Sequence, residues 1–176
     1  MRIAHAADIH IRNLKYHYEY REVFNQFYES LKEENVDCII LCGDIAHTKT
    51  QISPEFVKMA SDLFRSLADI APTYVILGNH DGNLRNHSRQ DALTPIVEAL
   101  EHPRLSLIRD SEEAVVGHSR GLPVKINVIS IFDKKNWLSP TDPEAVNIAL
   151  YHGALAGSKT DVGWVISHND DPLECF

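Results

Sequence analysis

The stretch Thr73–Gly82 (TYVILGNHDG) joins an apolar run to three groups that can bind metal or carry protons. Its first five residues are mostly β-branched or aromatic, which is typical of a strand buried on both faces. The run stops at Gly78, and Asn79, His80 and Asp81 follow. An amide oxygen, an imidazole and a carboxylate in a row suit a metal and acid–base site. The same letters are also acceptable chemistry for a polar turn, so both interpretations stay open here.

The same design recurs at three further places, where an apolar run ends in residues of ligand type. These are Arg2–Ala7 ahead of Asp8 and His10, Asp37–Cys42 ahead of Asp44 and His47, and Ile148–Tyr151 ahead of His152. The first three runs follow one another at about 35 residues, the length of a βαβ unit. Such units form a parallel sheet, and ligand residues collect at the carboxyl ends of its strands. We therefore expect the polar residues of all four runs to form one site.

Six of these groups are oxygen or nitrogen ligands without a thiolate, a set that suits Mn, Fe, Zn or Mg. Six are more than one metal needs, whereas two ions about 3.5–4 Å apart, bridged by a carboxylate, would use them all. Such a pair polarises phosphoryl oxygens and lowers the pKa of a water molecule towards neutrality. An imidazole not bound to metal could then protonate the leaving oxygen.

Two amphipathic helices must connect the first three strands. The first begins near Tyr16–Tyr20, and its apolar positions are Tyr20, Val23, Phe24, Phe27 and Leu31. The second has Ser53 as a plausible N-cap, Pro54 at its first position and a stop before Pro72. The later part of the chain gives weaker signals. They are a short helix started by Thr94 and Pro95, strands at Leu105–Ile108, Ala114–Val116 and Val124–Ile131, and turns at Gly117–Ser119 and Ser139–Asn147.

Composition indicates one globular domain with no membrane-spanning run and no signal peptide, because the start runs straight into Asp8 and His10. Cys38 and Cys42 fall on one predicted strand, where they serve as small buried apolar residues, and the expected location is cytoplasmic. The net charge of −8 argues against a broad nucleic-acid surface. It does not exclude nucleic acid at one metal-lined cleft, since divalent ions reverse the local sign.

Taken in order, Asp8-x-His10, Gly43-Asp44, Gly78–Asp81 and His152-Gly153 resemble the calcineurin-like metallophosphoesterase superfamily. Within it, Gly43-Asp44-x-x-His47 and the Tyr151–Gly153 context resemble the double-strand-break repair nucleases, including SbcD-type exonucleases and phage recombination endonuclease subunits. The resemblance implies an α/β core in which a two-sheet β-sandwich is flanked by helices. It also implies a metal-dependent DNA exonuclease or endonuclease of repair or recombination. The implied cofactors are two divalent ions, foremost manganese; the implied partners are DNA, an ATPase subunit and a possible second copy, without a membrane.

Residue by residue, the resemblance assigns one metal to Asp8 and His10, the bridging position to Asp44, and the second metal to Asn79 and His152. It makes His80 the general acid or a phosphate contact, and Asp81 the residue that orients the His80 ring. His47 would face substrate, although a loop or capping histidine is an equally good interpretation.

Two departures from the family pattern stand out. Arg12 occupies a position where this branch usually has glycine. The Gly-His-x-His-type motif that closes the site in the superfamily is absent after Gly153, since His118 precedes His152 and His168 fits a tail histidine. We therefore expect residues 1–176 to be one metallophosphoesterase domain that lacks its last ligand motif and any DNA-capping domain. Two alternatives follow: a small-molecule phosphoesterase, or a non-catalytic assembly module.

Overall fold

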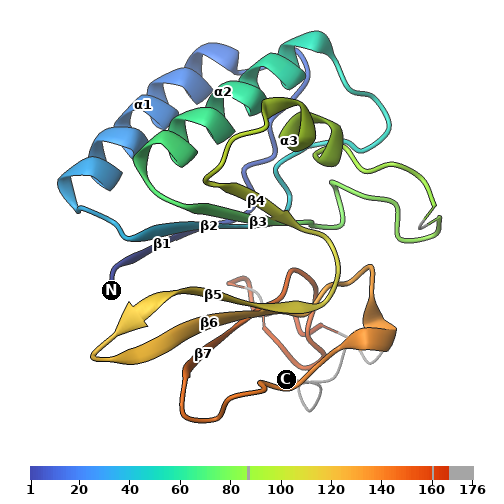
Figure 1. Cartoon of the computed structure of the whole chain (residues 1–176). Coiled ribbons are helices and arrows are strands. Elements are labelled where there is room, and N and C mark those ends of the chain that lie inside the picture. Colours follow the sequence, from blue (N-terminus) through green and yellow to red (C-terminus); the bar gives the residue numbers. More distant parts are fainter. Residues whose placement is uncertain (87, 160, 167–176) are drawn as a thin grey trace.

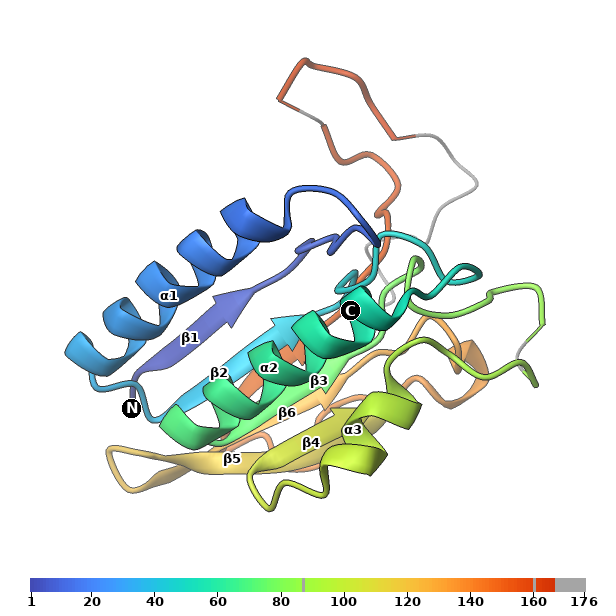
Figure 2. The same cartoon turned by 90° about the horizontal axis from the view of Figure 1, so that it is seen from above.

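The computed structural model describes residues 1–86, 88–159 and 161–166, and it places them in three layers (Figure 1). The middle layer is a parallel sheet in the order β1-β2-β3-β4. Its strands are β1 (Ile3–Ala6), β2 (Cys38–Cys42), β3 (Thr73–Ile76) and β4 (Leu105–Ile108). One face carries the helices α1 (His17–Glu33), α2 (Pro54–Ile70) and α3 (Thr94–Leu100), seen from above in Figure 2. The βαβαβ start expected from the sequence is confirmed.

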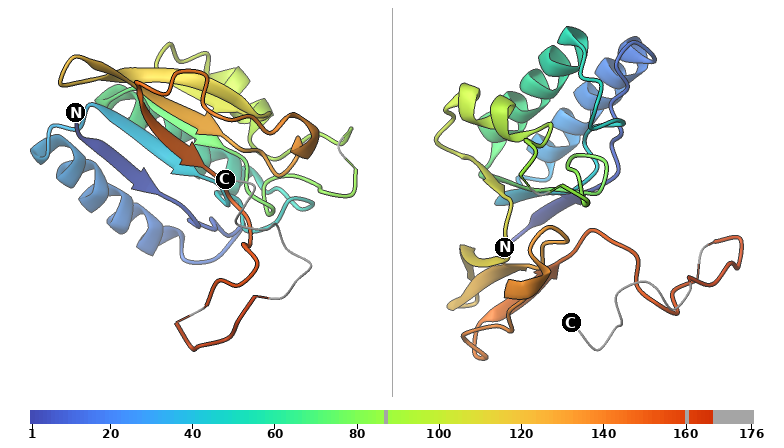
Figure 3. Two further views of the ribbon diagram at one scale, coloured as in Figure 1. Left: turned by 90° about the horizontal axis from the view of Figure 1, so that it is seen from below. Right: turned by 90° about the vertical axis from the view of Figure 1, so that its right-hand side faces the viewer.

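The second sheet covers the other face of the first and has the order β5-β6-β7. Its strands are β5 (Glu112–Ser119), β6 (Leu122–Val128) and β7 (Val146–Leu150). β5 and β6 form an antiparallel hairpin, whereas β7 joins β6 in parallel. The expected two-sheet sandwich is therefore confirmed, with all three α-helices of the described residues on the outer face of the first sheet. Seen from below, β7 points its carboxyl end the same way as β1 and β2 (Figure 3, left).

Strand β2 is buried along its whole length because it is covered on both faces. Alternate side chains of a strand point to opposite faces. Ile39 and Leu41 accordingly pack with the helices, while Cys38, Ile40 and Cys42 pack against the second sheet. Both cysteines are free thiols, and burial raises the pKa of each to about 11. They are small core residues, as the sequence predicted.

The two long helices differ in how well the sequence predicted them. At the start of α2, Ser53 Oγ accepts the N–H of Phe56 at 3.1 Å, and Pro54 is the first helical residue, as expected. In α1 the predicted apolar face is only partly buried, because among its five members Phe24 and Leu31 are buried but Val23 is 59% exposed. Tyr20 and Phe27 are partly buried against the same core, so four of the five predicted apolar positions pack inward and Val23 faces solvent.

The Gly117–Ser119 segment, predicted as a turn, lies within β5. Pairing with β6 continues as far as Ser119, so the hairpin turns at Arg120 and Gly121, both of which have positive φ. A local turn signal is overridden here by the hydrogen bonds that the partner strand supplies. His118 is exposed on this strand. His168 and Cys175 lie outside the described residues, and within those residues no helix is long and apolar enough to cross a bilayer.

Candidate metal centre

The loops after β1 and β2 run side by side beyond the strand ends and carry the first site residues. The N–H of Asp8 donates to Gly43 O at 3.1 Å, and the N–H of His10 donates to Asp44 O at 2.9 Å. Asp8, His10 and Asp44 have φ of 56°, 49° and 54°, a left-handed conformation that is uncommon for residues other than glycine. Such backbone strain is concentrated at functional sites, where the surrounding structure holds it in place.

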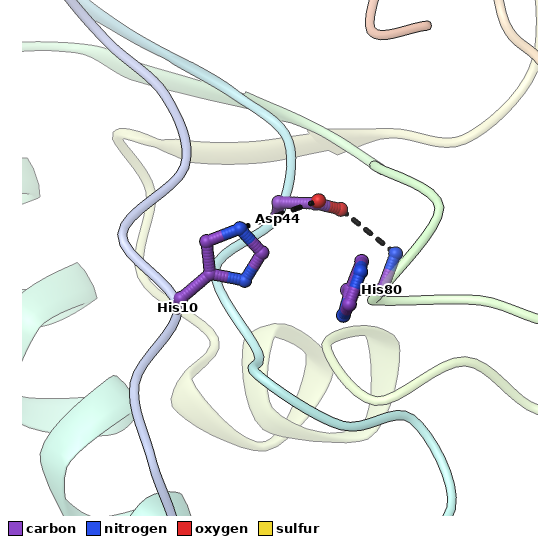
Figure 4. A group of neighbouring side chains, drawn as sticks. All are labelled: His10, Asp44 and His80. Atoms are coloured by element: carbon purple, nitrogen blue, oxygen red, sulfur yellow. Dashed lines mark hydrogen bonds and ion pairs between the residues drawn. The ribbon is translucent and has the colours of Figure 1, made fainter.

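Figure 4 shows the first group of potential ligands, His10, Asp44 and His80, which come from the loops after β1, β2 and β3. His10 Nε2 lies 3.6 Å from Asp44 Oδ2, and the backbone N–H of His80 donates to Asp44 Oδ1 at 2.8 Å. One ligand atom from each of the three side chains lies within 4.8 Å of the others. The side chain of Asp44 is 4% exposed, so its charge is held away from bulk water.

A second group shares Asp44 and adds Asp8 and His152, again with ligand atoms within 4.8 Å of one another. His152 Nε2 lies 3.3 Å from Asp44 Oδ2, while its Nδ1 lies 2.6 Å from Cys42 O. His152 follows β7, which belongs to the second sheet. The sequence argument that the ligands follow the strands of one parallel sheet therefore holds for the first three loops only. The Asp44 carboxylate is therefore in contact with a residue from the carboxyl edge of the second sheet as well as with residues from the first.

Two glycines make this close approach possible. A Cβ at Gly43, whose φ is 84°, would come within 2.5 Å of His152 Nδ1. A Cβ at Gly78 would collide with the backbone and carboxylate of Asp44. Both positions therefore exclude a larger side chain, which explains why a glycine stands directly before Asp44 and before Asn79.

The residues present fit a pair of divalent cations. His10 Nε2 lies 3.6 Å from both Asp8 Oδ1 and Asp44 Oδ2, so it is the imidazole nitrogen available to an ion, and Nδ1 of the same ring is buried without a hydrogen-bond partner among the described residues. The set combines carboxylate oxygens with imidazole nitrogens and contains no thiolate, which suits Mn, Fe, Zn or Mg. The pKa shifts of Asp44 and His152 also fit a cation site, because they show that the Asp44 carboxylate is ionised and next to positive charge. Burial works to raise the pKa of Asp44, but the hydrogen bonds from His152 and His80 outweigh it and lower that pKa.

His152 has the opposite shift. Burial works to lower its pKa, yet the contacts with Asp44 and the Cys42 carbonyl raise it to about 9. In the absence of an ion, this histidine supplies the positive charge next to Asp44. A cation that binds here takes over that position, because a ligating imidazole must be neutral.

Asp81 does not orient the ring of His80, and this prediction is wrong. Its carboxylate accepts three backbone N–H groups, from Asp44, Ala46 and Gly78, each at 2.8 Å. Asp81 is fully buried, and burial raises its pKa to about 7 while the bonds from Ala46 and Gly78 pull in the opposite direction. This side chain joins the loop after β2 to the turn after β3 and so fixes the backbone of Asp44.

The His80 ring is positioned instead by His47, whose carbonyl oxygen lies 2.8 Å from His80 Nδ1. The ring of His47 stacks on that of His80 with centroids 6.2 Å apart, and it meets His10 edge-on at 5.7 Å. Partial burial lowers the pKa of His47, as do the neighbouring charges of Arg12, His10 and His80. The structure thus brings His47 to the mouth of the site; its contact with substrate stays a prediction.

Two positioning residues were missed by sequence reasoning. Tyr20 donates its hydroxyl to His10 O at 2.7 Å, although its helical spacing assigned it to the core. Lys49 Nζ donates to Asn79 O at 2.7 Å and so supports the backbone of a proposed ligand. The helical period could not reveal the first contact, because it reports only that the Tyr20 ring faces the core. It does not show which group the hydroxyl at the end of the ring will bond. Nothing in the local sequence indicates the second.

The sequence matches the profile of the calcineurin-like phosphoesterases over residues 1–172. The chain therefore belongs to this family of metallophosphoesterases. Members of the family typically bind two metal ions, in agreement with the two ligand groups that share Asp44.

Among individual relatives, an uncharacterized protein of Acanthamoeba polyphaga mimivirus is 41% identical over 99% of this chain and 14% of its own length. The DNA double-strand break repair protein Mre11 of Methanopyrus kandleri is 30% identical over 94% of this chain and 40% of its own length. A solved structure, the Pseudomonas putida nuclease MPE, is 18% identical with a TM-score of 0.43, covering 70% of this chain and 52% of that one. The chain thus spans well under half the length of the curated relatives named here.

Proposed function

We propose that this protein is a manganese-dependent nuclease that hydrolyses phosphodiester bonds in DNA. The single observation that carries the proposal is that Asp44 belongs to both ligand groups while the His47 and His80 rings stack beside it. The similarity to Mre11 DNA repair proteins supports DNA as the substrate. When bound, the two ions would polarise the phosphoryl group and lower the pKa of a water molecule.

The proposed division of labour follows the family resemblance, and it differs from the two ligand groups, which pair His10 with His80 and Asp8 with His152. Asp8 and His10, whose Oδ1 and Nε2 atoms lie 3.6 Å apart, would hold one ion. Asn79 and His152 would hold the other, and Asp44 would serve both. His152 keeps Nε2 turned towards Asp44 because its Nδ1–H donates to Cys42 O. The same kind of bond at His80, from Nδ1–H to His47 O, leaves Nε2 as the atom that carries a proton to the leaving oxygen.

His80 also lies within ligand distance of Asp44 and His10, so a metal-binding role is the competing assignment for this residue. The two roles differ in what removal of the ring does to metal content, which makes them separable by mutation. The expected DNA-repair setting, the ATPase partner subunit, a possible second copy and the cytoplasmic location are parts of the same proposal.

The decisive experiment is the incubation of this chain with linear duplex DNA in manganese, with chelator as the blank. Degradation that depends on manganese and is lost in His80→Asn supports the proposal. His118→Asn is the matched control, because His118 is exposed on β5 and belongs to neither ligand group. Intact DNA together with rapid turnover of bis-p-nitrophenyl phosphate would instead identify a small-molecule phosphoesterase.

The small-molecule alternative has one observation in its favour, the net charge of −8, which weakens long-range attraction of a DNA duplex. A third candidate, a non-catalytic assembly module, makes a different prediction about metal binding. Calorimetric titration with manganese tests it directly. Tight binding of two ions contradicts the assembly module, whereas failure to bind any ion contradicts the nuclease.

A further inference from the structure

The segment of residues 12–18 (RNLKYHY), which is the end of the connection between β1 and α1 together with the first two residues of α1, has an unusual surface for an acidic protein. Leu14, Tyr16 and Tyr18 are exposed by 74%, 58% and 71%. Two cations, Arg12 and Lys15, alternate with them, in a chain whose net charge is −8. Exposed aromatic rings interleaved with cations are the pattern by which proteins bind single-stranded nucleic acid.

This connection is held in place although its side chains are exposed. Asn13 Nδ2 donates to Gln51 O at 2.6 Å, and Ser53 Oγ donates to Asn13 O at 2.9 Å. His17 Nε2 lies 2.6 Å from the carbonyl oxygen of Arg12 and closes the segment at its other end. Tyr16 has φ 62°, a conformation that an aromatic residue rarely adopts. The ring of Tyr16 is thus presented to solvent from a fixed backbone.

A chain of contacts links this segment to the metal centre. The N–H of His47 donates to Ile11 O at 3.1 Å, directly before Arg12. The guanidinium carbon of Arg12 lies 5.9 Å from the centre of the Tyr16 ring, within cation–π distance. His47, Arg12 and Tyr16 therefore follow one another outward from the ligands. The nearest opposing charge along the segment is Glu19, on the first turn of α1.

We propose that Arg12 and Tyr16 form a platform for unpaired nucleotides of the DNA strand being cut, with Lys15 and Tyr18 extending it. Tyr16 stacks on a base, and Arg12 pairs with a backbone phosphate. This inference rests on the proposed nuclease function and narrows its substrate to single-stranded DNA or to duplex ends with unpaired bases. In a duplex in which every base is paired, only the two terminal base pairs expose a face, whereas every unpaired nucleotide of a single strand can offer one.

The test measures binding separately from cleavage. Fluorescein-labelled, phosphorothioate-linked oligothymidylate, which resists hydrolysis, is titrated with the chain and followed by anisotropy; a blunt duplex of the same linkage is the comparison. Tyr16→Ala should weaken binding of the single strand by about tenfold, since stacking on one base is worth roughly 1–3 kcal/mol, and should change duplex binding little. Tyr16→Phe keeps the ring and should restore the single-strand affinity.

Arg12→Gln should weaken binding of both DNAs and reduce the steepness of their salt dependence by about one phosphate contact. Val115→Ala is the matched control, because Val115 is an exposed apolar residue of β5, in the second sheet. It should bind both DNAs as the unaltered chain does.

The results separate the platform from the nuclease proposal. If the unaltered chain cuts DNA but Tyr16→Ala binds the single strand normally, the platform is refuted and the nuclease stands. If the chain cuts no DNA yet binds oligothymidylate through Tyr16, the nuclease is refuted, and the platform stands as a binding site for single-stranded DNA but not as part of a cleavage site. Loss of self-association in Tyr16→Ala, with DNA affinity unchanged, would assign the segment to a protein interface and refute the platform.

Discussion

The first sheet, β1–β4, and the second sheet, β5–β7, pack through apolar side chains, yet they differ at their carboxyl edges. The first sheet supplies every candidate site residue except His152, and three of them, Asp8, His10 and Asp44, have a left-handed backbone in the loops after β1 and β2. The second sheet supplies His152 alone. The loop that carries Asp44 follows β2, which is buried throughout, so this strained loop is anchored on a fully buried strand. The candidate metal ligands and acid–base residues therefore gather in the loops that follow buried strands.

The two sheets also differ in how their charges are balanced. In the second sheet, Glu113 of β5 pairs with Lys125 of β6 at 2.6 Å, and both charges are satisfied by the fold itself. At the edge of the first sheet, the ionic partners of Asp8 and Asp44 within the described part of the chain are all histidines. Carboxylates gathered without lysine or arginine are an arrangement that a divalent cation completes. Substitutions at the two places should therefore have different consequences.

The largest effect is expected for Asp44→Asn. A carboxylate shared by both ligand groups offsets the repulsion between two cations, and a neutral amide does not. We expect the variant to lose at least one manganese ion and to hydrolyse no detectable phosphodiester. Metal content by mass spectrometry of the dialysed protein, beside an activity assay, measures both. A variant that retains both ions would show that Asp44 is not the shared ligand.

His80→Asn should have a smaller and different effect. If His80 carries the proton to the leaving oxygen, both ions stay bound and the rate falls by roughly a hundredfold to ten-thousandfold. The rate should be compared with that of a substrate whose leaving group needs no proton, such as a p-nitrophenyl ester, for which the loss should be much less. Loss of an ion in this variant would assign His80 to the ligands instead.

The contrast between the sheets also explains what the sequence could predict. The strands β1, β2 and β3 have apolar runs, and the helical periods place α1 and α2 in the connections between them, so the carboxyl edge of the first sheet was predictable. The strand before His152 was recognised, but its place in a second sheet was not, because pairing between β6 and β7 leaves no local signal. The role of Asp81 was missed for the same reason: its three partners lie on neighbouring loops.

Asp81→Asn turns that finding into a prediction about stability. The amide can still accept from two of the three N–H groups through its oxygen, but its NH₂ would face the third, that of Ala46. A buried donor left without an acceptor costs about 1–3 kcal/mol, so the free energy of unfolding should fall by that amount. Urea denaturation at pH 8, above the raised pKa of Asp81, measures it. An unchanged midpoint would contradict the role of this carboxylate in holding the two loops.

The smallest effect is expected in the second sheet, for Glu113→Gln. The Lys125 ammonium and the Thr141 N–H and hydroxyl groups lower the pKa of Glu113 to about 2. A carboxyl whose pKa is lower in the folded chain than its ordinary 4.5 stabilises the fold above pH 4.5, and that contribution is lost as the pH falls through about 2. The unaltered chain should therefore melt slightly above the variant at pH 7, and the two melting temperatures should converge between pH 4.5 and pH 2.

Both scans are run in chelator, so that the titration of the metal-site carboxylates is common to both proteins and cancels in the difference. Thr141→Val serves as the matched control, because it removes a hydroxyl that donates to Glu113 at 2.7 Å and accepts from Lys125 Nζ at 3.4 Å, but keeps the ion pair. At pH 7 the melting temperature of Thr141→Val should differ less from that of the unaltered chain than the melting temperature of Glu113→Gln does. A gap between Glu113→Gln and the unaltered chain that stays constant down to pH 2 would mean that the charge of Glu113 does not stabilise the second sheet. The proposed contrast, in which the second sheet balances its own charges and the first sheet needs cations, would then be wrong for the second sheet.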